Sequence, residues 1–294
     1  NPDIFVYGEG WTAGDSPLPV NDRALKAFTH RMPQVSAFSD DIRDGLKGSV
    51  FDDKSTGFVS GAESMEESVK FGVVGSIEHP EIDYAAVNYS NEPWANEPWQ
   101  AISYVSCHDN HTLYDKLKVS RPYANEATLV AMDKLANAIV LTTQGTAFLH
   151  AGAEMLRTKG GEHNSYKSPD AVNQMDWNWK VKNAEVFGYY KSLIALRKAH
   201  PAFWMQSAEE VRKNLSFAPV EPGLVSFAIR NHANGDEWKN IRVIYNAKLE
   251  PITYLSEEGE WTVAVLGDDF HPEGGPTGTK ITVPQLSMAL LFQK

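Results

Sequence analysis

The sequence predicts an α/β fold, namely four βα units of a (β/α)₈ barrel followed by an all-β antiparallel sandwich. Predicted strands and helices alternate four times within residues 1–206, which is typical of parallel βα units. A complete (β/α)₈ barrel takes about 250 residues and eight such units. From about residue 207, the sequence predicts short strands separated by turns in place of alternating strands and helices. We therefore expect half of a barrel at 1–206 and a β-sandwich at 207–294.

The first two units are predicted from apolar runs and helical periodicity. The run at 4–7, Ile-Phe-Val-Tyr, predicts a buried strand because β-branched and aromatic residues suit a packed, pleated surface. Apolar spacing at 22–32 predicts a helix with Asp22 as its N-cap. A short strand at 34–39 and a helix at 62–75 complete the pair.

The next two units carry the clearest patterns. Strands are predicted at 101–107 and 146–152. Helices are predicted at 127–145 and 183–203, the second with basic residues before Pro201, where a helix commonly ends. Long segments follow the strands and short ones follow the helices. A barrel builds an active site at its C-terminal face from such long segments.

The final module is predicted from its turns. Turn sequences at 221–223, 234–236 and 272–278 separate short strands, as in an antiparallel sandwich.

The composition excludes several classes of function. The 294 residues carry a formal net charge of −11, which disfavours a nucleic-acid partner because phosphates would be repelled. No apolar run approaches the roughly 20 residues that span a bilayer. One cysteine cannot form an intrachain disulfide. The chain enters a predicted strand at once, so we expect a piece of a longer protein, and the compartment is not predicted.

Two carboxylates stand just past predicted strands. Glu9 follows the strand at 4–7, and Asp109 follows the strand at 101–107. Catalytic groups of barrel enzymes occupy such positions. A carboxyl pair suits glycoside hydrolysis, in which one acid protonates the leaving oxygen and an anion faces the oxocarbenium ion. The acid needs a raised pKa, and a partly desolvated pocket beside Trp11 would supply it.

Other interpretations of these residues stay open. Glu9 and Asp109 could each be a loop acid in a cap or a surface ion pair. His108, Asp109 and His111 could bind a metal ion, although no second cluster with matching spacing stands out. A Cys107–His108 nucleophilic dyad is disfavoured, since neighbouring strand residues point to opposite faces.

Tryptophans near these acids suggest a carbohydrate cleft. Flat aromatic faces pack against the apolar faces of sugar rings, although each tryptophan alone could merely cap the barrel. Five of the eight tryptophans lie in or beside loops that follow predicted strands: Trp11, Trp94, Trp99, Trp177 and Trp179.

Four motifs together resemble one family. They are VYGEGW, AFSDDIRDGLKGSVF, YVSCHDNHTLYDKL and FLHAGAEMLRTKGGEHNSYKSPDAVNQMDW, in this order. The chain resembles the C-terminal portion of a type I pullulanase, a starch-debranching member of the α-amylase superfamily of glycoside hydrolases. The resemblance implies the second half of the barrel, strands five to eight, and the C-terminal β-domain. It implies cleavage of α-1,6 linkages in pullulan, starch or glycogen-type α-glucans.

The resemblance also implies roles for individual residues. Glu9 becomes the general acid/base, and Asp109 becomes the transition-state-stabilising carboxylate. His108 and Trp11 would contact sugar, whereas Asp41 and Arg43 would brace a loop. More distant sugar positions would be lined by Asn164, Tyr166, Asp170 and Asn173.

The pattern of the family is incomplete in this sequence. Its nucleophile is an aspartate after the fourth barrel strand, which would precede residue 1. The resemblance therefore implies that this chain alone is inactive, and that it needs the other half of the barrel or self-associates through exposed strand edges. No cofactor is required, although calcium is possible. An isoamylase-like debranching enzyme and a non-catalytic α-glucan-binding module are the alternatives.

Overall fold

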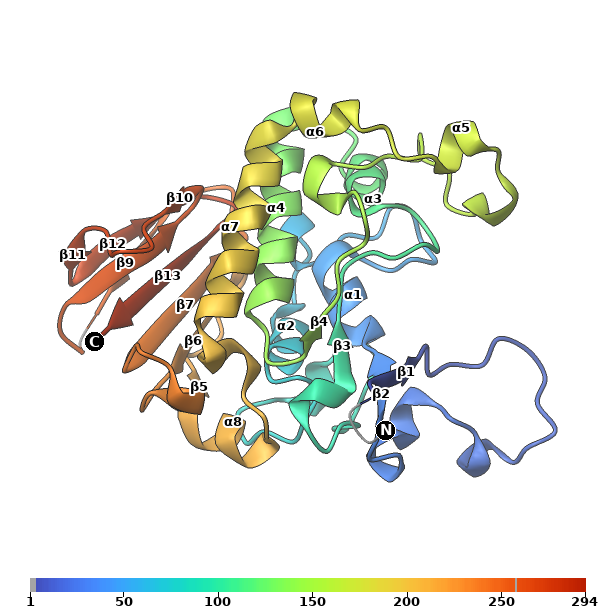
Figure 1. The fold of residues 1–294 in the computed structure, drawn as a ribbon, viewed down its shortest axis with the longest axis horizontal. Coiled ribbons are helices and arrows are strands. Elements are labelled where there is room, and N and C mark those ends of the chain that lie inside the picture. Colours follow the sequence, from blue (N-terminus) through green and yellow to red (C-terminus); the bar gives the residue numbers. More distant parts are fainter. Residues whose placement is uncertain (1–3, 257) are drawn as a thin grey trace.

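Two sheets with helices between them make up the chain. The computed structural model describes residues 4–256 and 258–294. A parallel sheet lies on one side, an antiparallel sheet on the other, and α4 (Glu126–Thr142) and α7 (Ala184–Ala199) run between them (Figure 1). None of the helices in these residues combines the length and the apolar character needed to cross a bilayer.

The first sheet has four strands in the order in which they occur along the chain. Neighbouring strands are parallel, as the alternating sequence pattern predicts. All four are shorter than predicted. Their bounds are Val6–Gly8 for β1, Val35–Phe38 for β2, Ala101–Ser103 for β3 and Thr146–Ala147 for β4.

The prediction that residues 4–7 form a buried strand is wrong as to burial. β1 is an edge strand of the sheet, and among the described residues only β2 pairs with it. Ile4 is 62% exposed and Tyr7 is 53% exposed. An apolar strand with an unpaired edge invites pairing with further strands.

The predicted helix at 22–32 is also wrong. The segment forms two short 3₁₀ turns, Val20–Asp22 and Lys26–Arg31, separated by extended residues. A tertiary contact competes with the helix, because the backbone N–H of Lys26 donates to the carbonyl oxygen of Gly10 at 2.6 Å. Asp22 therefore caps no helix.

The other three predicted helices are present with shorter bounds, and further helices occur that the sequence pattern did not reveal. Two of these, α1 and α3, directly follow the segments that leave β2 and β3. The remaining bounds are Asp40–Lys47 for α1, Glu66–Val73 for α2, Leu113–Ser120 for α3, Asp170–Asn173 for α5, Asn178–Lys182 for α6 and Ala208–Asn214 for α8.

The C-terminal part is antiparallel, as predicted, and its first strand begins at Leu215, after α8. A seven-stranded sheet runs in the order β10-β9-β13-β7-β6-β5 with β11 beside β9, and β12 pairs with β8 separately. The bounds are Leu215–Phe217 for β5, Leu224–Ile229 for β6, Asn240–Asn246 for β7, Ile252–Leu255 for β8, Trp261–Leu266 for β9, Asp269–Phe270 for β10, Thr277–Gly278 for β11, Lys280–Val283 for β12 and Ser287–Gln293 for β13.

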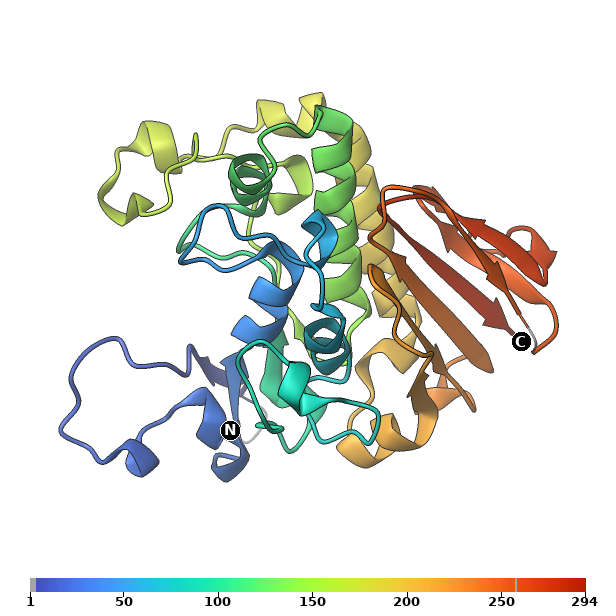
Figure 2. The ribbon, with the colours of Figure 1, turned by 180° about the vertical axis from the view of Figure 1, so that it is seen from behind.

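Both faces of the seven-stranded sheet are buried. Along β13, Met288, Leu290 and Phe292 join the large core that includes residues of α4 and α7. Ala289 and Leu291 point the other way, into a smaller core with residues of β12. This alternation follows from the two-residue period of a strand. Figure 2 shows α4 and α7 between the two sheets from behind.

Candidate active site

The segment that carries Glu9 is fixed by its neighbours. Glu9 directly follows β1, and Gly10 adopts a φ of +76°. A Cβ atom at Gly10 would lie 3.0 Å from the backbone nitrogen of Lys26. Only glycine combines that backbone conformation with such a close approach, so position 10 sets the direction in which the chain leaves Glu9.

A partly buried ionic network holds Lys26, whose backbone N–H donates to the carbonyl oxygen of Gly10. The ammonium of Lys26 pairs with Asp40 and with Asp41, at 2.8 Å from Oδ2 of Asp41. Asp41 is fully buried, and its Oδ2 also accepts from Trp94 Nε1 at 3.2 Å. Trp94 therefore belongs to the core and cannot form a sugar-binding wall, which corrects the expectation from its position in the sequence.

The segment Cys107–His111 leaves β3 and turns sharply into α3. Asn110 adopts a φ of +62°, a conformation that asparagine tolerates better than most residues. The turn sends His111 away from the preceding residues, and its Nε2 lies 3.1 Å from Asp53 Oδ1 in a buried position. The proposed metal triad of His108, Asp109 and His111 is thus not assembled.

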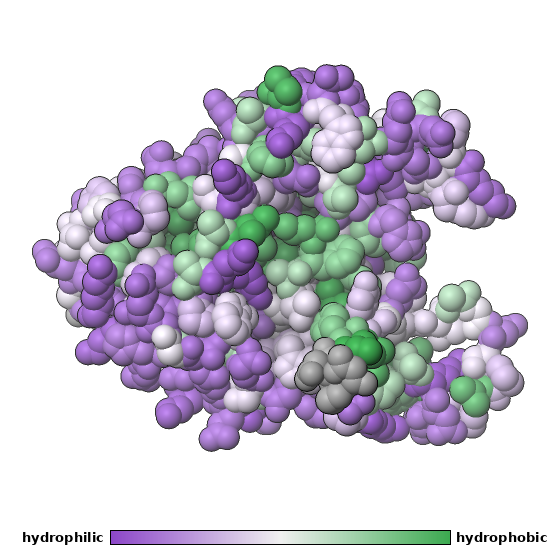
Figure 3. All heavy atoms as spheres, in the orientation of Figure 1, coloured by the Kyte–Doolittle hydropathy of each residue, from purple (hydrophilic) through white to green (hydrophobic). Residues whose placement is uncertain are grey.

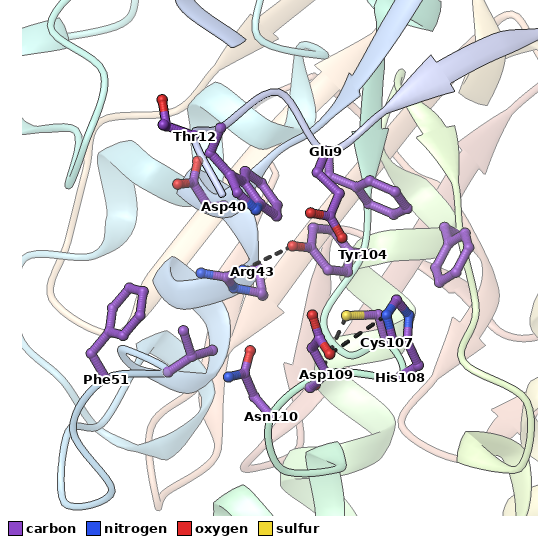
Figure 4. A pocket seen from close by; sticks show the side chains of 14 residues that line it. Glu9, Thr12, Asp40, Arg43, Phe51, Tyr104, Cys107, His108, Asp109 and Asn110 are labelled. Atoms are coloured by element: carbon purple, nitrogen blue, oxygen red, sulfur yellow. Dashed lines mark hydrogen bonds and ion pairs between the residues drawn. The ribbon is translucent and has the colours of Figure 1, made fainter. Parts of the chain in front are cut away.

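Glu9, His108 and Asp109 come together in one cleft of about 510 Å³. Their carboxylate and imidazole atoms lie within 4.8 Å of one another, and His108 Nε2 is 3.5 Å from Asp109 Oδ1. The carboxylates of Glu9 and Asp109 point toward each other from opposite sides of the cleft (Figure 4). Two acids 100 residues apart in sequence are therefore neighbours beyond the carboxyl ends of β1 and β3.

The cleft is open on the side of the two acids. Glu9, His108 and Asp109 are all exposed. The desolvated pocket expected around Glu9 is therefore not closed by the described residues. In contrast, Cys107 is partly buried, and burial raises the pKa of its thiol. A raised pKa lowers the thiolate population, which gives a Cys107–His108 dyad no support.

The cleft wall is rich in aromatic side chains. Arg43 braces two of them: its Nη1 donates to the hydroxyl of Tyr104 at 3.0 Å, and its guanidinium lies 5.9 Å from the ring centre of Trp11. Arg43 also bonds Asp44 through Nε at 2.6 Å. Burial would lower the pKa of Arg43, but the hydrogen bond and charge of Asp44 outweigh burial and raise it. The guanidinium is a permanent cation behind the cleft.

Phe51 is a lining residue that sequence reasoning missed. It is 89% exposed and lies on the cleft, in the segment between α1 and the buried turn Phe58–Ser60. Lys116, on α3, holds this segment by donating to the carbonyl oxygens of Asp52 at 2.5 Å and Asp53 at 3.2 Å. Because these contacts join residues more than 60 positions apart, no local pattern could have revealed them.

The four residues expected at outer sugar positions do not line this cleft. Asp170 and Asn173 lie in α5, and Asn164 and Tyr166 lie at the 3₁₀ turn Ser165–Lys167 before it, on a segment that projects from the molecule (Figure 1). Tyr166 is 71% exposed. The side-chain amide of Asn173 donates to the carbonyl oxygens of Ser165 and Ser168, at 2.7 and 3.1 Å, and so shapes its own segment. In Figure 3 the surface is hollowed between this projection and the one formed by the segment after β1.

Comparisons with known proteins show which proteins this chain is similar to. Residues 211–269 match the family model described as the all-beta domain of pullulanase. The pullulanase of Bacillus subtilis is 37% identical over 282 residues, which is 96% of this chain and 38% of that protein. An isoamylase of Pseudomonas amyloderamosa is 26% identical over 129 residues, covering 40% of this chain and 16% of that protein.

Solved structures show the same similarity. A pullulanase from Bacillus acidopullulyticus superposes with a TM-score of 0.92 at 39% identity, covering 100% of this chain and 34% of that one. A pullulanase from Paenibacillus barengoltzii, solved in complex with maltohexaose and alpha-cyclodextrin, gives a TM-score of 0.87 at 40% identity over 99% of this chain and 44% of that one. The chain is therefore a homologue of the pullulanases that spans less than half the length of these relatives.

Proposed function

We propose that this chain is part of a debranching glycoside hydrolase that cleaves α-1,6 linkages in pullulan, starch or glycogen-type α-glucans. The observation that carries the proposal is the convergence of Glu9 and Asp109 on one open, aromatic-walled cleft. The homologous pullulanase from Paenibacillus barengoltzii was solved with maltohexaose, which supports an α-glucan as the ligand here too.

Apart from the nucleophile, the cleft offers groups suited to such a cleavage. Glu9 protonates the glycosidic oxygen of the leaving glucan, and its carboxylate then activates water. Asp109 places a negative charge beside the oxocarbenium-like transition state. His108 hydrogen-bonds the sugar at the cleavage point, and Trp11 packs against a sugar ring. The residues proposed for more distant sugars remain Asn164, Tyr166, Asp170 and Asn173.

The nucleophile is proposed to lie outside this sequence. A retaining glycosidase needs its two carboxyl groups about 5–5.5 Å apart. Glu9 and Asp109 come within 4.8 Å, so distance alone would permit Asp109 to attack. The resemblance to pullulanases instead assigns the attack to an aspartate on an earlier strand. Asp40 also lines the cleft, but its carboxylate is paired with Lys26.

We also propose that the parallel sheet is half of a (β/α)₈ barrel. β1 and β4 form the two ends of the sheet, and the side chains of Ile4 and Tyr7 are more than half exposed. Four further strands pairing with β1 and β4 would close the sheet, cover these side chains and complete the cleft beside Glu9. By itself, the chain would use the same edges for self-association.

One experiment tests whether hydrolysis requires the part of the enzyme that lies outside this chain. The 294-residue chain and the full-length enzyme that contains it are each incubated with pullulan, and reducing ends are measured. We expect release by the full-length enzyme and at most trace release by the chain, which should elute as an oligomer in light-scattering chromatography.

The outcomes separate the alternatives. Appreciable hydrolysis by the chain alone would place the nucleophile within these 294 residues and contradict the assignment above. Cleavage of branched starch but not pullulan by the full-length enzyme would favour the isoamylase-like alternative. Binding of maltotriose without turnover by the full-length enzyme would leave a non-catalytic α-glucan-binding module.

Replacing Phe51 by alanine should weaken glucan binding. An aromatic contact contributes about 0.5–1.5 kcal/mol, so the KM of the full-length enzyme for pullulan should rise about two- to tenfold while kcat changes less. Tyr123→Ala is a matched control, because Tyr123 is fully exposed and does not line the cleft. An unchanged KM in Phe51→Ala would exclude Phe51 from the binding surface.

The proposed reaction proceeds through side chains and requires no cofactor. Calcium binding stays a prediction, which elemental analysis after exhaustive dialysis of the full-length enzyme would test.

A further inference from the structure

The segment that carries Asp109 is connected to the segment after β4 by a buried lysine. Lys159 is 5% exposed, and its ammonium donates to the carbonyl oxygen of His108 at 2.6 Å. That carbonyl belongs to the peptide bond between His108 and Asp109. Burial, followed by the nearby charge of Arg157, lowers the pKa of Lys159. A buried ammonium is costly unless it is well placed, so this contact is a specific feature of the fold.

Lys159 is itself fixed by a carboxylate on α3. Asp115 is 3% exposed, and its Oδ2 accepts from the backbone N–H of Lys159 at 2.7 Å. Its Oδ1 accepts from the hydroxyl of Thr158. The backbone N–H of Asp115 in turn donates to Thr112 Oγ1 at 3.1 Å, the N-cap of α3. A rigid helix start therefore holds Lys159, and Lys159 holds the peptide beside Asp109.

The position of this contact matters because the backbone turns immediately afterwards. Asn110 has a φ of +62°, and the side chains of His108 and Asp109 are 78% and 60% exposed. These two side chains have little packing of their own to keep them in the cleft. Their direction depends on how the backbone of Cys107–Asn110 is held.

We infer that Lys159 is a positioning residue that fixes the His108–Asp109 peptide, so that the Asp109 carboxylate faces Glu9 across the cleft. This inference rests on the proposed function for its effect on catalysis. The mechanical part, restraint of the Cys107–Asn110 backbone, is independent of it. The two parts can therefore be tested separately.

The mechanical part is tested on the 294-residue chain by amide hydrogen exchange. Lys159→Met removes the donor while keeping a side chain of similar length. We expect at least tenfold faster exchange in peptides covering 107–110, with exchange in 101–103 unchanged. Lys134→Met is the matched control: Lys134 is also a buried lysine, but its ammonium pairs with Asp268 at 2.8 Å, away from the cleft. Unchanged exchange at 107–110 in Lys159→Met, or equal acceleration there in Lys134→Met, would overturn the inference.

The catalytic part is tested in the full-length enzyme on pullulan. In Lys159→Met, kcat should fall tenfold or more while KM stays within threefold, and Lys159→Arg, which retains a charged donor, should recover part of the loss. Lys134→Met should keep kcat within twofold even where its melting temperature falls. A kcat of Lys159→Met within twofold of wild type would remove the role in catalysis. An inactive wild-type enzyme would contradict the proposed function, and the exchange result would still decide the mechanical part.

Discussion

Glu9→Gln should lower kcat of the full-length enzyme on pullulan by about 10²–10⁴-fold, the usual contribution of a general acid/base group. Glutamine keeps the shape of the side chain but cannot donate a proton to the leaving oxygen. Because Glu9 is exposed and the substitution is isosteric, the melting temperature should barely change. Initial rates of reducing-sugar release, measured at several pullulan concentrations, give kcat and KM separately.

A matched control separates chemistry from surface charge. Glu209 is an exposed glutamate on α8 that does not line the cleft, so Glu209→Gln should keep kcat within twofold. Asp109→Asn should also lower kcat strongly, since it removes the negative charge facing the oxocarbenium ion. A Glu9→Gln enzyme that retained a tenth or more of the wild-type rate would show that another group supplies the proton.

Asp133 should make the stability of the chain depend on pH. Asp133 lies on α4 and is 1% exposed. Its Oδ1 accepts from the hydroxyl of Tyr190 at 2.6 Å, while its Oδ2 has no hydrogen-bond partner among the described residues. Burial raises the pKa of Asp133 from 3.8 to about 7, although the Tyr190 hydrogen bond and the charge of Lys134 act against the rise.

The sign of the effect follows from this raised pKa. Between pH 3.8 and about 7 the folded chain holds a proton that the unfolded chain releases, so stability falls as the pH rises through this window. The stabilisation that comes from protonation of Asp133 is fully present below pH 3.8 and is lost above about pH 7. At 1.36 kcal/mol per pKa unit, the loss amounts to up to about 4 kcal/mol.

Asp133→Asn should remove this pH dependence. Urea unfolding of the 294-residue chain at pH 4 and pH 8 gives the free energy of unfolding of each variant. The change in the free energy of unfolding that Asp133→Asn causes relative to wild type should be more stabilising at pH 8 than at pH 4, by up to about 4 kcal/mol. Asp15→Asn, at an exposed position, should show no such difference. If the two substitutions behaved alike, the buried carboxyl of Asp133 would not be the source.

The meeting of Glu9 and Asp109 could be predicted because it depends on local signals and one general rule. Each acid comes two residues after an apolar run, and parallel strands place such residues beyond the carboxyl ends of the strands, on one side of the sheet. The four strands are predicted from short apolar runs, which locate them but not their ends. The three longest predicted helices are found because their helical periodicity extends over several turns.

The errors occurred where distant contacts decide the structure. Nothing near Trp94 distinguishes it from Trp11, yet Trp94 bonds the buried Asp41 while Trp11 lines the cleft. The helix predicted at 22–32 does not form, because the backbone N–H of Lys26 bonds the carbonyl oxygen of Gly10 instead of a helical partner. The exposure of Ile4 and Tyr7 depends on where β1 lies in the sheet, which apolar character alone does not give.

The continuity of the main core governs how the chain could be shortened. Phe203 and Met205 on one side of the predicted boundary at 206/207, and Ala208 and Val211 on the other, belong to one buried cluster with α4, α7 and β13. A truncation there would expose apolar surface of both remaining parts to water. The whole chain should accordingly melt in a single cooperative transition. Transfer of the β-rich part to another protein would require new apolar residues that cover the face now packed against α4 and α7.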